Sequence, residues 1–211
     1  MNDRIFIFDF DGTIADTHRH IINISNSLAE EFGYAVIQPH EVNYLKDKTS
    51  REVIHYLKVP IYKIPAILSR AKKELFEGIT AIEPIKGLKS VLQELSTAGA
   101  RMGILSSNAT ENIHQFLKNH GLEVFEFVDS TLKVWTKNIS LKKLLKEHGL
   151  EAGQILYIGD ETRDIEAAKT LGIKVAAVTW GYNSEKALKA HQPDFLIHTP
   201  QELLELCNNH V

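Results

Sequence analysis

The chain has 211 residues, of which 44% are hydrophobic and 24% are charged, and its net charge is -3. These proportions are typical of a globular protein, and a chain of this length can bury a core without disulfides or structural metals. The balance of charge gives no reason to expect a nucleic acid or an anionic membrane as partner, and no stretch approaches the length of a membrane span.

The first predicted element is a buried strand over residues 5–8. Its four residues, Ile-Phe-Ile-Phe, are continuously apolar, which is typical of a strand covered on both faces of a parallel sheet. The acidic, glycine-containing segment from Asp9 to Gly12 then ends the strand. We therefore expect a loop with two carboxylates at the C-terminal edge of a sheet.

The next segment, residues 16–84, is predicted to be entirely helical. Apolar residues recur at helical spacing from Ile21 to Phe32, and Gly33 is placed to end that helix. The sequence Thr-Ser-Arg-Glu at residues 49–52 has the form of a capping box and predicts a second helix. Pro65 is suited to the first turn of a third helix. This segment is interpreted as a small helical insert.

After residue 84 the pattern changes to alternating helices and strands. This alternation predicts a doubly wound α/β fold with a parallel sheet, in which ligands bind at the C-terminal ends of the strands. The predicted strands are 102–105, 126–128, 155–158, 175–178 and 195–197. The predicted helices are 88–95, 113–117, 139–148, 165–171 and one that starts at residues 199–202 with a capping box and Pro200.

Several strand ends carry residues suited to chemistry on phosphate. Besides the loop from Asp9 to Thr13, Ser106 and Ser107 follow the strand 102–105, and Lys137 follows 126–128 across a loop. Asp160 and Asp164 follow the strand 155–158. Because parallel strands end at the same edge of a sheet, these residues are expected to meet in one crevice.

This set of residues resembles the haloacid dehalogenase superfamily and, within it, the phosphatases similar to phosphoglycolate phosphatase. The segment Asp-Phe-Asp-Gly-Thr that starts at Asp9 matches the first motif of that family, and Ser106 matches the second. The Gly-Asp-x-x-x-Asp pattern containing Asp160 and Asp164 matches the fourth. The resemblance covers nearly the whole chain and implies a Rossmann-like core, residues 1–15 and 85–211, with a helical cap, residues 16–84.

The third motif of the family is a single lysine, for which the sequence offers two candidates. Lys137 precedes a predicted helix in the expected place, and Lys133 competes with it. The family often has a proline-containing segment after this lysine, which is missing here. Lys137 is preferred, and Lys133 remains open.

Transfer of a phosphoryl group needs a nucleophile and a proton for the leaving oxygen. Asp9, at the strand end, can attack phosphorus and form an aspartyl phosphate. Asp11 lies two residues further on, so it can point back toward the same pocket, protonate the leaving alcohol and later activate water.

The four aspartates and a phosphate would repel one another strongly without a cation. Two like charges about 4 Å apart repel by roughly 4 kcal/mol at an effective dielectric constant near 20. Carboxylate ligands suit Mg²⁺, which is therefore the expected cofactor. The resemblance implies that Asp9, Asp160 and the backbone carbonyl of Asp11 bind the metal directly, and that Asp164 orients the ligands.

The phosphate is expected to be held by small and polar residues around the same loops. Gly12 permits close backbone approach, and Ser106 and Lys137 can bind phosphate oxygens. Backbone N–H groups near Thr13 and Ser107 are expected to help form an anion site. For Ser106 the alternative is a role as helix N-cap.

The insert resembles the mobile cap of this superfamily, which excludes water and selects a small substrate. Lys46, Lys48 and Arg51 are candidates for binding a second anionic group, although a solvated face is the simpler account of each. Glu161 and Arg163 are interpreted as solvated residues of a helix's first turn. Phosphoglycolate fits by resemblance, and sugar or nucleoside monophosphates would also fit.

The predicted function is therefore a Mg²⁺-dependent phosphatase acting on a small phosphorylated metabolite. A phosphomutase has the same core residues, and a non-catalytic phosphate sensor is a further alternative, although a sensor has no need of both Asp9 and Asp11. A dehalogenase is disfavoured because Asp11 is present. The chain has a single cysteine, Cys207, which allows a reducing compartment, and its N-terminus lacks a signal-peptide core, so a soluble cytoplasmic protein is expected. A monomer or homodimer is expected.

Overall fold

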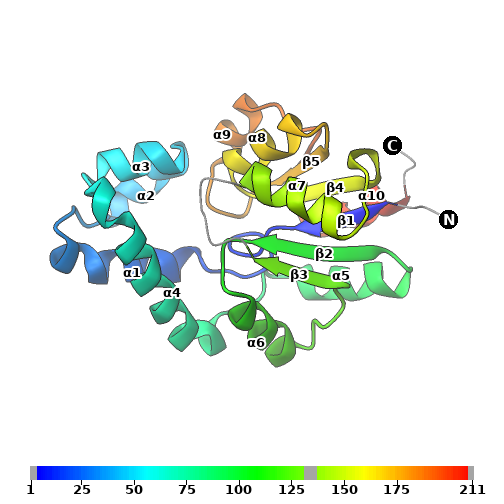
Figure 1. Ribbon diagram of the computed structural model, residues 1–211, viewed down its shortest axis with the longest axis horizontal. Helices are drawn as coiled ribbons and strands as arrows, with labels where there is room; N and C mark the ends of the chain where they lie inside the picture. Colours follow the sequence, from blue (N-terminus) through cyan, green and yellow to red (C-terminus); the bar gives the residue numbers. More distant parts are fainter. Residues whose placement is uncertain (1–3, 131–136, 209–211) are drawn as a thin grey trace.

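The computed structural model describes residues 4–130 and 137–208. Its centre is a sheet of six parallel strands in the order β3-β2-β1-β4-β5-β6, so the predicted doubly wound α/β fold is confirmed (Figure 1). The strands are β1 Ile5–Phe8, β2 Arg101–Ser106, β3 Phe127–Ser130, β4 Ile155–Gly159, β5 Lys174–Val178 and β6 Phe195–Ile197.

β1 lies in the middle of the sheet, paired with β2 on one side and β4 on the other. The chain fills the β2 side first and then crosses to β4, so the order of strands reverses beside β1. Ligands bind at such a switch point in open α/β sheets. The residues that follow β1, β2 and β4 are therefore placed for function.

The two faces of the sheet are covered by different helices. Phe6 and Phe8 of β1 pack on one face, in the same apolar cluster as residues of α5 Leu88–Thr97, α6 Thr110–His120 and α10 Glu202–Asn208. Ile5 and Ile7 pack on the other face, with residues of α7 Lys137–Glu147, α8 Thr162–Thr170 and α9 Glu185–Ala190. The apolar run in β1 thus serves both faces, as the sequence indicated.

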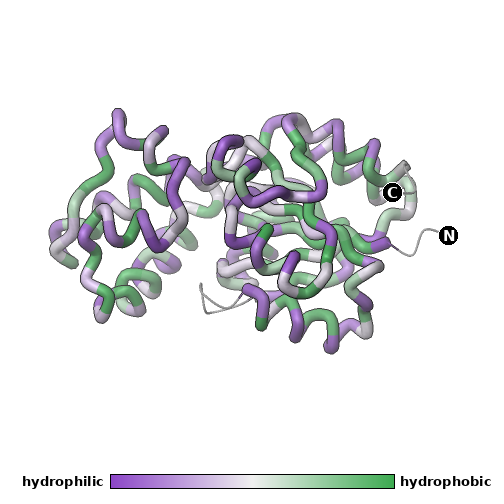
Figure 2. The backbone as a smooth tube through the Cα atoms, turned by 90° about the horizontal axis from the view of Figure 1, so that it is seen from above, coloured by the Kyte–Doolittle hydropathy of each residue, from purple (hydrophilic) through white to green (hydrophobic). Residues whose placement is uncertain are grey.

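Four helices form a separate group beyond the carboxyl ends of the strands, where the arrows of Figure 1 point. They are α1 His18–Phe32, α2 Val42–Lys46, α3 Ser50–Tyr56 and α4 Ile64–Gly78. Seen from above in Figure 2, this group is the smaller of two lobes. Short 3-10 turns at Pro39–Glu41, Ile61–Lys63 and Ile79–Ala81 connect or extend these helices, and a fourth, Ala152–Gln154, precedes β4.

The two chain segments that join the lobes run side by side. The amide of Asp16 donates to the Glu83 carbonyl at 2.9 Å, and the amide of Ile85 donates to the Ile14 carbonyl at the same distance. Ala15 and Pro84 form an isolated antiparallel bridge between these bonds. The helical lobe is therefore attached to the sheet by one narrow, hydrogen-bonded pair of strands.

The local helix signals in the sequence are confirmed where they depend on near neighbours. Gly33 ends α1 in the left-handed conformation, with φ of 74°. The side chains of Thr49 and Glu52 form the predicted capping box at the start of α3. The last helix starts two residues later than predicted: Thr199 and Glu202 do pair, but α10 begins at Glu202 rather than at Pro200.

Among the residues that the structure describes, none belongs to a helix long and apolar enough to cross a membrane.

Candidate active site

The loop after β1 places Asp9 at the bottom of the crevice. The Asp9 side chain is almost fully buried, and its Oδ1 accepts a hydrogen bond from the Phe10 amide at 2.8 Å. The amide of Asp9 itself donates to the Ile158 carbonyl of β4, which fixes the end of β1 against its neighbour. The carboxylate therefore has a defined position with one oxygen held by the backbone.

Lys137 lies between two buried carboxylates. Its Nζ is 2.6 Å from Oδ2 of Asp9 and also contacts Oδ1 of Asp164. The lysine is the first residue of α7, and Asp164 lies in the first turn of α8, so the ion pairs join β1 to two helices. The competing residue Lys133 lies outside the described residues.

Asp160, at the end of β4, is held by the loops beside it. Its Oδ1 accepts a hydrogen bond from the Thr13 hydroxyl at 2.6 Å, and its Oδ2 accepts one from the Tyr182 amide at 2.7 Å. The Thr13 side chain thus faces Asp160, and its amide donates to the Phe10 carbonyl at 3.3 Å. Phosphate binding by Thr13 and the backbone N–H groups near it stays a prediction.

Gly12 is required by the close packing of this loop. Its φ is +78°, in the left-handed region that side chains other than glycine rarely adopt. A Cβ atom at this position would collide with the Asp160 carboxylate and with the Tyr182 ring. Its amide donates to the Ala15 carbonyl at 2.9 Å. Gly12 thus permits the approach of the Asp9–Thr13 loop to Asp160.

The carboxylates have the geometry and chemistry of a cation site. Oxygen atoms of Asp9, Asp160 and Asp164 lie within 4.8 Å of one another, and all three side chains are buried. Oxygen donors of this kind match the preference of Mg²⁺. The structure thus brings together three of the four residues predicted as metal ligands, and Asp11 lies on the same loop.

The electrostatics of the buried group favour an added cation. Burial raises the pKa of Asp9 to about 6 despite the neighbouring Lys137, and it raises the pKa of Asp160 well above the ordinary range. Burial opposes the charge on Lys137, but Asp164 and Asp9 hold its pKa well above the ordinary value. The charges of Lys137 and Arg163 thus do not offset the cost of burying the Asp9 carboxylate, and an added cation would favour its charged form.

Asp11 points to the other side of the loop, toward β2. Its two carboxylate oxygens each accept a hydrogen bond from Asn108 Nδ2 at 3.2 Å. Burial, together with the nearby charge of Asp9, raises the pKa of Asp11 to about 7. A carboxyl group with such a pKa can both give and take a proton near neutral pH.

Ser106 and Ser107 follow β2 at the same edge of the crevice. The Ser106 hydroxyl is buried and accepts a hydrogen bond from the Asn108 amide at 3.1 Å. The N-cap of α6 is Ala109, so the alternative role of Ser106 as that cap is wrong. Ser107 is partly buried and lines a cavity that also reaches Asp11.

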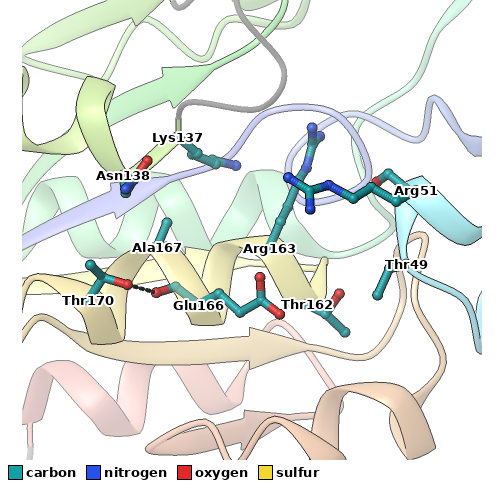
Figure 3. A pocket seen from close by; sticks show the side chains of 10 residues that line it. Thr49, Arg51, Lys137, Asn138, Thr162, Arg163, Glu166, Ala167 and Thr170 are labelled. Carbon is teal, nitrogen blue, oxygen red and sulfur yellow. Dashed lines mark hydrogen bonds between the residues drawn. The ribbon is translucent and has the colours of Figure 1, made fainter. Parts of the chain in front are cut away.

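Sequence reasoning missed Asn108 as a site residue and misjudged Arg163 and Glu161. The place of Asn108 directly after Ser106 and Ser107, at the end of β2, was a usable signal. The Arg163 and Glu161 side chains are 25% and 14% exposed and form an ion pair, so their interpretation as solvated residues is wrong. Figure 3 shows Arg163 of α8 beside Arg51 of α3, with the Lys137 side chain directed toward them. These three cations line a cavity of about 400 Å³.

The helical lobe contacts the sheet lobe through the segment between α2 and α3. Asn183 Nδ2 donates to the carbonyls of Lys46 and Lys48, both at 3.0 Å, while its Oδ1 accepts from the Thr162 amide. Lys46 Nζ donates to the Gly181 carbonyl at 2.9 Å. The loop after β5 therefore holds the helical lobe over the site, a role that sequence reasoning did not find.

Comparison with known proteins identifies the family of this chain. A family model described as haloacid dehalogenase-like hydrolase matches residues 6–178. A phosphoglycolate phosphatase of Synechococcus elongatus is 34% identical over 200 residues, which cover 94% of each chain. Pyrophosphatase PpaX of Bacillus cereus is 23% identical over 219 residues, covering 96% of this chain and 95% of that protein.

Solved structures share the fold. The crystal structure of a protein described as a predicted phosphatase from Clostridium acetobutylicum superposes with a TM-score of 0.83 at 20% identity, covering 97% of this chain and 98% of that one. At this level of identity the likeness speaks for the fold alone.

Proposed function

The chain belongs to the haloacid dehalogenase-like hydrolases, and from that premise we propose that it is a Mg²⁺-dependent phosphatase that hydrolyses a small phosphate monoester through an aspartyl phosphate on Asp9. The observation that carries the proposal is the buried arrangement of Asp9 against Lys137, with Asp160 and Asp164 in reach of the same cation. The names of the relatives make phosphoglycolate the first substrate to test.

Asp9 is the proposed nucleophile. A carboxylate oxygen of Asp9 attacks phosphorus, a new O–P bond forms, and the bond from phosphorus to the alcohol oxygen breaks. The Phe10 amide and Lys137 fix the orientation of this carboxylate before substrate arrives. Such positioning speeds the attack on phosphorus, because the attacking atom needs no rearrangement.

Asp11 is the proposed acid and base. In the first step its proton goes to the leaving alcohol oxygen. In the second step Asp11 takes a proton from a water molecule, whose oxygen attacks phosphorus and releases phosphate from Asp9. The pKa of about 7 and the hydrogen bonds from Asn108 support this assignment.

Asp9, Asp160 and the carbonyl of Asp11 would hold the metal, with Asp164 orienting the set. When bound, Mg²⁺ neutralises the charge of the phosphate oxygens and of the carboxylates around them. Thr13 and the Tyr182 amide support this role indirectly, because both hold the Asp160 carboxylate in place. Lys137, Ser106, Ser107 and the backbone around Gly12 are the proposed contacts to the phosphate group.

Residues 16–84 are proposed as the cap, and residues 1–15 and 85–211 as the catalytic core. The paired connections at residues 15–16 and 83–85 support a hinge there. The hydrogen bonds from Asn183 to the backbone of Lys46 and Lys48 support a closed position in which the cap shields the site from water.

A release assay tests the proposed function. Purified protein is incubated with phosphoglycolate, sugar phosphates, nucleoside monophosphates and p-nitrophenyl phosphate, with Mg²⁺ or with a chelator, and released phosphate is measured. We expect release that depends on Mg²⁺ and is lost in Asp9→Asn. Equal release in Asp9→Asn, or no release from any ester, would refute the proposal.

A further inference from the structure

The helical lobe lines a cavity of about 390 Å³ that is partly open to solvent and reaches the proposed catalytic acid. Its walls come from all four helices of the lobe, and at the sheet edge it is lined by Asp11, Ser107 and Tyr182. Its volume lies in the range of roughly 300–1,000 Å³ that is usual for small-molecule sites. The cavity is therefore large enough to hold part of a substrate.

The wall of this cavity is predominantly apolar. Aliphatic side chains from each helix of the lobe face it, among them Ile21, Leu28, Leu45, Ile54, Ile67 and Ala71. In Figure 2 the smaller lobe accordingly carries hydrophobic stretches along its helices. A folded protein usually fills such space with side chains, because an empty apolar cavity lowers stability.

The cations that line the cavity already have partners. Lys46 Nζ donates to the Gly181 carbonyl, Lys48 lies 3.9 Å from Glu52, and Arg163 pairs with Glu161. Arg51 does not line this cavity but the separate one shown in Figure 3. A second anionic group of a substrate would therefore have to compete with these partners for the cations.

The position of Asp11 indicates which part of the substrate the cavity would receive. The acid that protonates the leaving oxygen must lie beside that oxygen, so the rest of the alcohol extends beyond Asp11. Asp11 lines the cavity, whereas Asp9 is buried beneath it against Lys137. The alcohol part of the ester is thus directed away from the nucleophile and into the apolar space.

We propose that this cavity receives the leaving alcohol, and that the substrate is the phosphate monoester of an apolar alcohol rather than of a small hydroxy acid. The inference rests on the proposed phosphatase function and names the substrate class for the same site. Alkyl or aryl groups would displace water from the wall and fill space that the side chains leave empty.

A series of alkyl phosphates tests the inference on the wild-type protein. Methyl, ethyl, butyl and hexyl phosphate and phosphoglycolate are compared by kcat/KM at saturating Mg²⁺. Burial of one methylene group corresponds to about a fourfold gain, so each added carbon should raise kcat/KM by about that factor until the cavity is full. Hexyl phosphate should exceed both methyl phosphate and phosphoglycolate.

Two matched variants test whether the gain in kcat/KM along the series arises in the cavity. Ala71 and Ala66 lie on α4, but Ala71 lines the cavity and Ala66 is exposed outside it. In Ala71→Phe the added ring should abolish the gain from methyl to hexyl phosphate, measured as the ratio of the two kcat/KM values. In Ala66→Phe the gain should persist. If Ala71→Phe does not fold, competitive inhibition of methyl phosphate hydrolysis by 1-hexanol, but not by glycolate, in the wild type gives the same answer.

The outcomes separate this inference from the proposed function. Release from methyl phosphate with a flat or falling series, or with phosphoglycolate preferred, would overturn the inference and leave the phosphatase in place. Absence of release from every ester would overturn the proposed function, and this inference with it.

Discussion

Lys137 is the side chain whose removal should most affect the stability of the metal-free protein. Its Nζ lies 2.6 Å from Asp9 and contacts Asp164, and its side chain is only 8% exposed. Methionine has a similar length and retains the apolar stem, so Lys137→Met removes the charge with little change in packing. Two buried carboxylates then lose their only described lysine partner.

The size of the effect follows from the cost of an uncompensated buried charge. Breaking a buried ion pair by removing one partner costs about 3–5 kcal/mol. For a chain of this length each kcal/mol shifts the melting temperature by about 2–4 °C, so a fall of about 6–20 °C is expected at pH 8. Added Mg²⁺ should reduce the fall, because the cation also neutralises the carboxylates.

Calorimetry at pH 8, with a chelator or with Mg²⁺, measures this fall. Lys142→Met is the matched control, because Lys142 is an exposed residue of the same helix and its loss should change stability by less than about 0.5 kcal/mol. Adding Asp164→Asn to Lys137→Met should restore part of the loss by removing one charge. Lys133→Met serves as the comparison for the other candidate lysine and should retain most of the activity.

Equal melting temperatures for Lys137→Met and the Lys142→Met control in the chelator would refute the reasoning, since the buried pairs would then contribute nothing. So would a double variant less stable than Lys137→Met alone.

Three further results are expected. Gly12→Ala should cost at least about 2 kcal/mol and abolish phosphate release, because φ is +78° and the methyl group would collide with Asp160; an unchanged melting temperature would contradict this packing. Burial raises the pKa of Asp9 to about 6 and that of Asp11 to about 7 from 3.8, so these two carboxyl groups bind more protons in the folded protein than in the unfolded chain between about pH 4 and 7. Their contribution to the stability of the metal-free protein should therefore be lost and the melting temperature should fall as pH rises through this window, and Mg²⁺ should restore it; a rise would show that the sign is wrong. Asn108→Ala should lower kcat/KM about 10- to 100-fold, because Asn108 positions Asp11, and steady-state kinetics with calorimetry as folding control would reveal whether the loss is catalytic.

The sequence predicted those features that depend on neighbouring residues. The apolar run of β1, the capping box at Thr49 and the glycine that ends α1 each involve contacts within a few positions, so local chemistry determines them. The convergence of Asp9, Asp160 and Lys137 was also predictable, because parallel strands end at one edge and the resemblance identified the motifs.

The sequence did not reveal features that arise from contacts between distant segments. Asn183 bonds the backbone of Lys46 and Lys48, each more than 130 residues away along the chain. It also bonds the amide of Thr162. The Thr13 hydroxyl donates a hydrogen bond to Asp160, which follows only from how the two loops pack. Such contacts leave no periodic or local signal.

The apolar cavity could not be predicted from the sequence for a related reason. Helical spacing in residues 16–84 predicts which side chains face inward, but not whether they fill the space between the helices. Ile67 and Ala71 have the spacing of core positions on one helix, and the structure places both on the wall of the cavity that reaches Asp11.

The central claim is that Asp9 carries the phosphoryl group during turnover. The most direct measurement is acid quenching of Asp11→Asn during reaction with a ³²P-labelled ester, followed by peptide mapping of the label, with Asp9→Asn as control. The ester is p-nitrophenyl phosphate, whose leaving group departs without a proton from Asp11. Because Asp11→Asn retains the nucleophile but cannot activate water, we predict that label accumulates on the peptide containing Asp9 and is absent from the control. Label on another residue, or phosphate release by Asp11→Asn with no label on the peptide containing Asp9, would contradict the account.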